Sequence, residues 1–262
     1  MEIAKLATID WCAPWLAPVA GQGRAITASR NWRESLNQAA EAAHLSNASG
    51  QRITFCEHNA IDEAYETHIA RTGRVPTRAN LHDLFNALVF LLFPKAKAQL
   101  NWLQSMAIAS DGIRPVRGPL RDAATLIDEN GVLLVTDRLD IVESLRRRNW
   151  VELFQNQRAA WGGAVKAIAF GHALMEKLQR PYKAVTAHTL HIALEPDSSL
   201  NEIDRRMAAS LDECLTPRDL LPLPVLGIPG WWAANESPDF YADPVVFRPA
   251  KMRPDRKAET DS

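Results

Sequence analysis

The chain has 262 residues, of which 47% are hydrophobic and 23% are charged, a composition typical of globular proteins and unlike that of disordered or fibrous chains. Its 30 lysines and arginines against 31 aspartates and glutamates give a net charge of -1. This balance removes the broad electrostatic attraction that nonspecific nucleic-acid binding relies on, so a nucleic-acid partner is not expected.

The three cysteines and the apolar runs favour a cytoplasmic protein. Cys12, Cys56 and Cys214 have no CxxC spacing, which argues against a disulfide framework or a zinc knuckle. The first residues lack the basic stretch and apolar run of a secretory signal. The longest apolar run, residues 87–93, is far shorter than the roughly 20 residues of a bilayer-spanning helix, so no membrane span is predicted.

The first half of the chain is predicted to be mostly helical. Residues 1–25 mix prolines, glycines and tryptophans, and this mixture predicts an irregular arm that packs through its aromatic side chains. Spacing of apolar residues then predicts a helix at 32–44, a short strand at 53–56 and a helix at 60–72 that ends at Gly73.

A strongly apolar helix is predicted next. Asn80 can act as its N-cap, with Asp83 three residues on in the reciprocal capping position. Its apolar stripe consists of Leu81, Leu84, Phe85, Leu88 and Leu92. Pro94 is expected to break or bend it, and a further helix is predicted at 95–108.

The second half is predicted to add a sheet. Two apolar runs, 124–128 and 132–135, flank Asn130-Gly131, and Asn-Gly between apolar runs predicts a β-hairpin because both residues tolerate positive φ. Further strands are predicted at 164–170 and 184–194, with helices at 172–179 and 200–215. The expected fold is therefore α+β, with a mostly helical N-terminal half packed on a small, largely antiparallel sheet with helices.

The C-terminal part is rich in proline and tryptophan. Residues 216–250 contain prolines too closely spaced for a helix or a central strand, yet they are too apolar for a free tail. They are predicted to wrap the domain as an irregular segment. Residues 251–262 are charged and predict a disordered tail, so residues 1–250 are expected to form a single globular domain.

Polar side chains gather at the start of the apolar helix. His82 and Asn86 lie one turn apart on one face, and Asp83 is beside them. An imidazole, an amide and a carboxylate can position a ligand or, with further donors, bind a metal. The alternative, and the more common role at a helix start, is that Asp83 caps the helix while the other two satisfy nearby backbone.

His172 is the strongest single candidate. It follows Phe170-Gly171, where a predicted strand turns into a helix, and Glu176 is one turn further on. Strand ends and helix starts commonly assemble sites in α/β-type folds. The alternative is a capping or packing histidine.

His188 is a second histidine candidate in the predicted strand 184–194. His188 and His191 are three residues apart, so on a strand they point to opposite faces and cannot both bind one metal. His188 shares its face with Leu190 and Ile192, which is more typical of a hydrogen-bonded core histidine than of a histidine facing a pocket.

Charged residues around the predicted hairpin complete the candidates. Arg121-Asp122 before it and Asp128-Glu129 at its tip supply carboxylates. A pair of these carboxylates can serve acid/base chemistry or bind a divalent ion, although aspartate and asparagine are also ordinary turn residues, the more common role. Residues 146–148 are arginines beside Trp150 and can contact phosphate, but a solvated helix end is the more common role. GxGxxG, GxSxG and phosphate-loop motifs are absent.

Several of these segments occur together in one known family. They are residues 76–89, 93–94, 100–101, 121–123, 128–131, 170–174, 186–188 and 223–232. With this combination the chain resembles a bacterial family called domain of unknown function 3025, over most of residues 60–250. The resemblance implies no activity, cofactor or catalytic residue, because none is assigned to that family.

The leading functional hypothesis is a hydrolase-like acid/base or metal-dependent enzyme. His172 would act as general base or ligand, with His82 and His188 as its partners. Asp128 or Asp83 would orient or coordinate. The ligand-binding candidates are Asp83, Asn86, Arg78, Arg121, Trp231 and Trp232. A divalent metal is a compatible cofactor and a small molecule a compatible ligand.

This hypothesis predicts a convergence of three segments. The helix at 80–93, the start of the helix at 172 and the strand at 184–194 are expected to meet at a pocket covered by Trp231 and Trp232. The alternative is a non-catalytic binding domain, in which the proline- and tryptophan-rich segment forms a groove for a small molecule or a protein.

Overall fold

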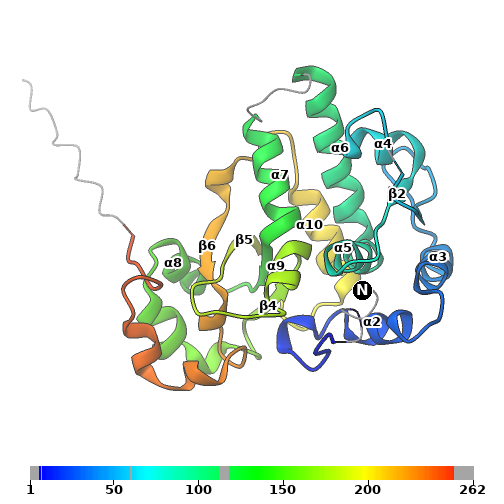
Figure 1. Cartoon of the computed structure of the whole chain (residues 1–262). Helices are drawn as coiled ribbons and strands as arrows, with labels where there is room; N and C mark the ends of the chain where they lie inside the picture. Colours follow the sequence, from blue (N-terminus) through cyan, green and yellow to red (C-terminus); the bar gives the residue numbers. More distant parts are fainter. Residues whose placement is uncertain (1–5, 7, 60, 112–117, 251–262) are drawn as a thin grey trace, which may run out of the picture.

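Helix α5 (Leu81–Leu92) lies at the centre of the helical half, because residues 83–91 are all buried. The computed structural model describes residue 6 and residues 8–59, 61–111 and 118–250. Asn80 caps α5 as the sequence predicts, since its side-chain oxygen accepts a hydrogen bond of 2.8 Å from the backbone N–H of Asp83. A helix buried on all sides must be covered by other elements, and these are arranged around it (Figure 1).

The other helices are α2 (Ala20–Thr27), α3 (Trp32–Ala42), α4 (Tyr65–Thr72), α6 (Pro94–Asp111), α7 (Pro119–Asn130), α8 (Leu139–Arg146), α9 (His172–Lys177) and α10 (Leu200–Ser210). The strands are β1 (Thr54–Cys56), β2 (Arg74–Pro76), β3 (Gly131–Val135), β4 (Lys166–Ala169), β5 (Thr186–Ile192) and β6 (Leu221–Pro224). Short helical turns lie at Pro14–Leu16, Glu152–Asn156, Arg158–Ala160, Pro217–Asp219, Val225–Gly227, Ala233–Glu236 and Pro238–Ala242.

The predicted α+β class is confirmed, but the main sheet is mixed rather than purely antiparallel. Its strand order is β4-β3-β5-β6. The β3–β4 and β5–β6 pairs are antiparallel, whereas the central pair, β3 and β5, is parallel, with Gly131 opposite His188. β1 and β2 form a separate parallel pair. All five residues of β3 are buried, as expected for a central strand covered on both faces.

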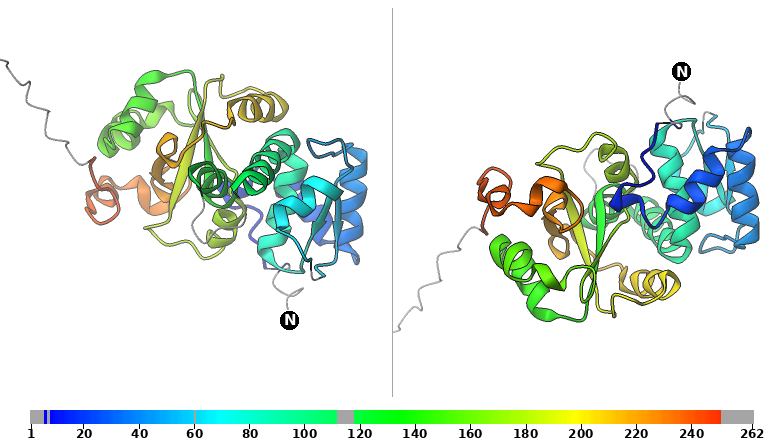
Figure 2. Two further views of the ribbon diagram at one scale, coloured as in Figure 1. Left: turned by 90° about the horizontal axis from the view of Figure 1, so that it is seen from above. Right: turned by 90° about the horizontal axis from the view of Figure 1, so that it is seen from below.

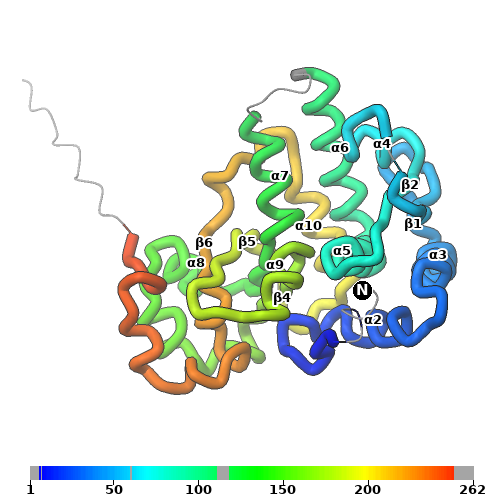
Figure 3. The backbone as a smooth tube through the Cα atoms, in the orientation of Figure 1, coloured from blue at the N-terminus to red at the C-terminus, as the bar shows by residue number. Residues whose placement is uncertain are grey.

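Figure 2 shows this covering from above and below. α7 and α9 lie on one side of the four-stranded sheet, and α8 with the C-terminal segment lies on the other. The backbone tube in Figure 3 shows that α3, α4, β1 and β2 form the outer side of the helical half, beyond α5 and α6. The elements that face each other between the two halves are α5 and α6 on one side and α7, α9 and α10 on the other.

The predicted hairpin at residues 124–135 is wrong. Residues up to Asn130 belong to α7, and only β3 beyond it is a strand. Ala123, Ala124 and Ile127 recur at helical spacing and are fully buried. Burial of this apolar helix face stabilises a helix here, although the Asn-Gly pair locally favours a turn. Asn130-Gly131 marks the end of a helix instead of a hairpin turn.

The N-terminal arm is more regular than predicted. α2 contains Gly21 and Gly23, and a Cβ at position 23 would overlap the ring of Trp11. Gly23 is therefore a site of close packing rather than a helix breaker. The predicted helices at 60–72 and 200–215 are shorter in the structure, at Tyr65–Thr72 and Leu200–Ser210. α6 begins at Pro94 itself, where the missing N–H of proline costs no helical hydrogen bond.

The proline-rich segment wraps the domain as predicted. β6 contains Pro222 and Pro224, which an edge strand tolerates because one side of it makes no ladder hydrogen bonds. Beyond it, Tyr241 and Phe247 pack against Phe154 with ring centroids 5.5 and 6.3 Å away. The predicted tail at 251–262 lies outside the described residues. Among the described helices, none combines the length and hydropathy needed to cross a bilayer.

The start of α6 is fixed by a buried carboxylate from another helix. Asp204 of α10 is 1% exposed and accepts hydrogen bonds from the backbone N–H groups of Lys95 (3.0 Å) and Ala96 (2.8 Å). Burial raises the pKa of Asp204, while these two donors act against that rise. The carboxylate does the work of an N-cap across a tertiary contact, and it aligns the helix that carries Lys97.

We expect Asp204→Ala to lower the free energy of unfolding by about 2–3 kcal/mol, because two buried N–H groups lose their acceptor. Urea denaturation followed by circular dichroism measures this loss. Asp204→Asn retains one acceptor oxygen, so its free energy of unfolding should lie between those of the wild type and the alanine variant. An alanine variant as stable as the wild type would contradict this role.

Candidate functional site

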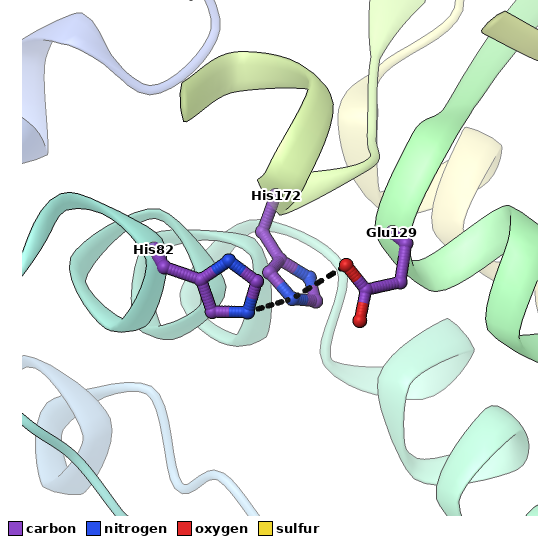
Figure 4. Close-up of side chains that lie close together, drawn as sticks. All are labelled: His82, Glu129 and His172. Atoms are coloured by element: carbon purple, nitrogen blue, oxygen red, sulfur yellow. Dashed lines mark hydrogen bonds and ion pairs between the residues drawn. The ribbon is translucent and has the colours of Figure 1, made fainter. Parts of the chain in front are cut away.

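Three helices present two histidines and a carboxylate to one point. His82 comes from α5, Glu129 from the last turn of α7 and His172 from the first turn of α9 (Figure 4). The Nε2 atoms of His82 and His172 are 3.1 Å apart, and Glu129 Oε2 is 3.9 Å from His172 Nε2. One donor atom from each residue lies within 4.8 Å of the other two. We call these three residues the histidine cluster.

Close backbone packing brings α9 to the end of α7. The N–H groups of Phe170 and Gly171 both donate to the carbonyl of Gly131, at 3.0 and 2.8 Å. A Cβ at position 171 would overlap the backbone of residues 129–131. Only glycine fits there without displacing the backbone, and this contact sets His172 beside Glu129.

The outer nitrogens of both imidazoles face carboxylates. His82 Nδ1 is 3.1 Å from Glu176 Oε2. Glu176 is one turn beyond His172, so the same short helix supplies one histidine and the partner of the other. His172 Nδ1 is buried, makes no hydrogen bond to a described residue, and is 3.9 Å from Asp128 Oδ2.

His172 is held as a neutral imidazole. It is 4% exposed, and this burial lowers its pKa to about 4, although the carboxylate of Asp128 acts in the opposite direction. A neutral imidazole has a free lone pair for a metal or a proton. The electrostatics therefore favour the form of His172 that acts as a base or ligand at neutral pH.

A buried ion pair lies directly behind the cluster. Lys97 of α6 is 4% exposed, and its Nζ donates to Asp128 Oδ1 at 2.5 Å and to Asn86 Oδ1 at 2.9 Å. The ammonium also lies 4.4 Å from the centroid of the Phe90 ring. Burial acts to raise the pKa of Asp128, but the charge and the hydrogen bond of Lys97 act against it, and the pKa lies below its usual value.

A polar cavity of about 200 Å³ opens onto the cluster, and we call it the histidine pocket. Its walls come from α4, α5, α7, α9 and the segments before them. They are lined by His58, Tyr65, Glu66, Pro76, Arg78, His82, Asp83, Asn86, Asp128, Glu129 and His172.

Glu66 has a carboxyl group whose pKa is raised far above its usual value. Burial, reinforced by the charge of Asp128, raises the pKa of Glu66 to about 7. Its Oε2 accepts a hydrogen bond of 2.6 Å from the side-chain amide of Asn101. Beside it, burial raises the pKa of Tyr65 well above its usual value, and the phenol oxygen accepts from the Asn86 amide at 3.3 Å. Glu66 can thus gain or lose a proton near neutral pH.

The structure brings most of the predicted site residues together. His82, Asp83, Asn86, Arg78, Asp128 and His172 all line the histidine pocket, and Arg121 lines a cavity next to it. Asp83 is tied to Arg78, whose backbone N–H, Nε and second guanidinium nitrogen donate to its carboxylate at 2.6, 3.0 and 3.0 Å. The Asp83 carboxylate therefore holds the loop before α5 through these hydrogen bonds.

Three predicted residues lie elsewhere. His188 is on β5, half-buried, and is not among the residues that line the pocket. Trp231 is 8% exposed and packs on Trp15, with ring centroids 6.2 Å apart. Trp232 is partly buried against the core. The predicted tryptophan cover and the contribution of the strand at 184–194 are thus not found at this pocket.

The sequence comparison agrees with the resemblance noted above. The family described as "Protein of unknown function (DUF3025)" matches residues 53–251. The chain belongs to this family. No curated protein and no solved structure matches it. The DUF3025 region contains every residue of the histidine pocket, so the pocket lies wholly within the part of the chain that defines the family.

Sequence reasoning did not single out Glu66 or Lys97. Lys97 follows Phe93 by four residues and precedes Leu100 by three, so it interrupts a buried helical stripe, and that position is a signal for a buried charge. Glu66 carries no comparable signal, because a glutamate in the first turn of a helix is the ordinary choice for the dipole. Its role depends on the helices that surround it.

We expect Lys97→Met to destabilise the protein by about 3–5 kcal/mol, because it leaves the buried Asp128 carboxylate without its counter-charge. The double variant Lys97→Met/Asp128→Asn should recover most of this loss. Urea denaturation of both measures the difference. Arg147→Met removes an exposed partner of Glu143 and serves as control, with little change expected. Equal instability of the single and double variants would contradict the ion-pair explanation.

Glu66 gives a prediction for pH dependence. Its pKa is raised in the fold to about 7, so its contribution to stability is fully present below its unfolded pKa of 4.5 and is lost as pH rises through about 7. Glu66→Gln cannot ionise and should escape this loss. We expect it to exceed the wild type in stability by about 1–2 kcal/mol at pH 8, and to match it near pH 4.5. Denaturation midpoints across this range measure the effect, and a constant difference between the two proteins would contradict it.

Proposed function

We propose that this protein is a metal-dependent hydrolase in which His82, Glu129 and His172 hold a divalent ion. The observation that carries the proposal is the histidine cluster, with donor atoms from three helices within 4.8 Å of one another. Two imidazoles and one carboxylate form a common ligand set of catalytic zinc, in which a further position stays open for water or substrate.

The spacing of the donor atoms fits such an ion. Zinc–nitrogen bonds of about 2.0–2.1 Å place two ligands of a tetrahedral ion about 3.3 Å apart. The separations of 3.1 Å between the two imidazole nitrogens and 3.9 Å to Glu129 lie on either side of this value. Glu129 has 41% of its side chain exposed, so its carboxylate has room to adjust.

The outer contacts of the imidazoles give further support. Metal-binding histidines usually donate their other N–H to a carboxylate or carbonyl, which fixes the ring and raises its basicity. Glu176 faces His82 in this way at 3.1 Å, whereas Asp128 lies 3.9 Å from His172 Nδ1, beyond hydrogen-bond distance. Two histidines that served only to cap or pack would not require a carboxylate behind each ring.

The pocket residues supply the remaining chemistry. A divalent ion at this position would lower the pKa of a water and polarise the bond to be cleaved. Glu66, with its pKa of about 7, is the residue we assign to proton transfer. In the hydrolysis, the water oxygen forms a bond to the acyl carbon, the bond to the leaving group breaks, and a proton of the water passes through Glu66 to the leaving atom.

A metal-free acid/base enzyme is the second candidate. The 3.1 Å contact between His82 and His172 is also the length of a hydrogen bond between two imidazoles, and Glu176 extends it to a carboxylate. Such a chain can relay a proton. The non-catalytic binding domain has less support, because Trp231 of its expected groove is buried in the core.

The proposal extends to the compartment and the ligand. We place the activity in the cytoplasm on a small-molecule substrate. The support for the cytoplasm is that Cys12, Cys56 and Cys214 are all free thiols. The support for a small substrate is the modest size of the histidine pocket.

The test is metal binding by the full chain after removal of metal with a chelator. We expect one Zn²⁺ or Co²⁺ per chain by isothermal titration and elemental mass spectrometry, with the absorption spectrum of four-coordinate Co²⁺. His82→Ala, His172→Ala and Glu129→Gln should abolish stoichiometric binding. Glu176→Gln should weaken it by about 10–100-fold, because it acts through His82.

His188→Ala is the matched control, since it removes a histidine outside the pocket and should leave metal binding unchanged. Wild-type protein that binds neither ion, or a His172→Ala variant that binds as well as the wild type, would overturn the metal proposal. The proton-relay candidate would then be the one to pursue.

A further inference from the structure

A second cavity continues from the histidine pocket. It has a volume of about 290 Å³ and shares Tyr65, Glu66, Asp128 and Glu129 with the first. Its remaining wall comes from α6 and α7 and includes Gln104 and Arg121. We call it the side pocket. A substrate that reaches the histidine cluster has room to extend into it.

The carboxylates of the shared wall have their charges balanced. Asp128 is paired with Lys97, and Glu129 would face the bound ion of the proposed function. Glu66 accepts a short hydrogen bond from Asn101 and takes up a proton near neutral pH. The carboxylates shared by the two pockets therefore leave little net negative charge facing the side pocket.

Arg121 is a cation that forms no ion pair with a described carboxylate. Within the described part of the chain, its guanidinium makes no hydrogen bond and has no carboxylate within ion-pair distance. Its field nevertheless reaches the pocket, where it acts to lower the pKa of Glu66. A guanidinium that lines a cavity and is not bound to the protein is suited to hold an oxyanion of a ligand.

Gln104 adds a neutral hydrogen-bonding group to the side pocket. It is 8% exposed, lines the side pocket, and its amide makes no hydrogen bond to any described residue. The amide is not among the buried side-chain groups that lack a partner, so it faces the cavity and can donate to or accept from a group bound there. Gln104 and Arg121 lie on the wall of the same cavity, one neutral and one cationic.

We propose that the side pocket binds a carboxylate of the substrate through Arg121 and Gln104, while the bond to be hydrolysed lies at the histidine cluster. This inference rests on the proposed function. The substrate class is a small acid with a hydrolysable acyl group, such as an amide or ester, set a few bonds away from its carboxylate. One guanidinium and one amide suit a singly charged carboxylate better than a phosphate dianion, which usually gathers several cations.

The test uses probes that bind zinc at one end and carry a carboxylate at the other. These are the monohydroxamates of succinate, glutarate and adipate, each compared with the straight-chain alkyl hydroxamate of equal carbon number. Isothermal titration of zinc-loaded full-length protein gives their affinities. We expect at least one carboxylate probe to bind about tenfold or more tightly than its alkyl match, the gain typical of a charge-assisted hydrogen bond.

Substitutions assign this preference to the side pocket. Arg121→Gln should remove it while leaving the affinity for alkyl hydroxamates unchanged within about twofold, the usual precision of such a comparison. Arg121→Lys keeps the positive charge but lacks the planar guanidinium group, so it should retain part of the preference for carboxylate probes. Arg205→Gln removes an exposed arginine from α10 and serves as the charge-matched control. Melting temperatures of the variants show that each is folded.

The outcomes separate the two proposals. Absence of zinc binding would overturn the proposed function. Zinc binding with equal affinity for the carboxylate and alkyl probes would leave that function standing and overturn the side-pocket inference. A carboxylate preference that survives Arg121→Gln would also overturn it.

Discussion

The buried ammonium of Lys97 joins the three helices on which the site depends. It comes from α6 and bonds Asn86 of α5 and Asp128 of α7. A charge in the interior is tolerated only when its partners are held in place, so these contacts restrict how the helices can move relative to one another. Asp128 also faces His172, and Glu129 follows it in the chain. The interior and the site therefore share one network of charges.

The same network explains why neighbouring carboxylates behave differently. Asp128 is hydrogen-bonded to the charged Lys97 and stays ionised, whereas burial and the repulsion of Asp128 raise the pKa of Glu66, so Glu66 holds its proton to higher pH. Separation of the pKa values of nearby acids is how active sites obtain one group that stays charged and another that exchanges protons. In this pocket the separation follows from the ion pair of Asp128 with Lys97 and from the burial of Glu66.

Sequence patterns predicted the elements that carry the site better than the residues that complete it. His82 and His172 were found because each begins a helix whose start is marked by Asn80 or Gly171. The hairpin prediction failed because Asn130-Gly131 is compatible with two structures, and tertiary packing of α7 decided between them.

Glu66 and Lys97 were missed for a different reason. Their roles arise from contacts between distant parts of the chain, such as that of Lys97 with Asp128, 31 residues away. Local periodicity contains no information on which helices will meet. His188 shows the opposite error. It was predicted as a site residue from its type and its place on a strand, but it does not line the pocket.

The contact of Gly171 with the end of α7 would couple metal binding at the histidine cluster to folding. His82 and His172 are 90 residues apart in sequence, and they meet only after β3 and β4 have paired and α9 has docked on α5. An unfolded chain cannot present these donors together, so an ion or inhibitor held by them binds the native state alone. Such a ligand draws the folding equilibrium toward the native state by mass action, and the gain grows with the logarithm of its concentration above the dissociation constant.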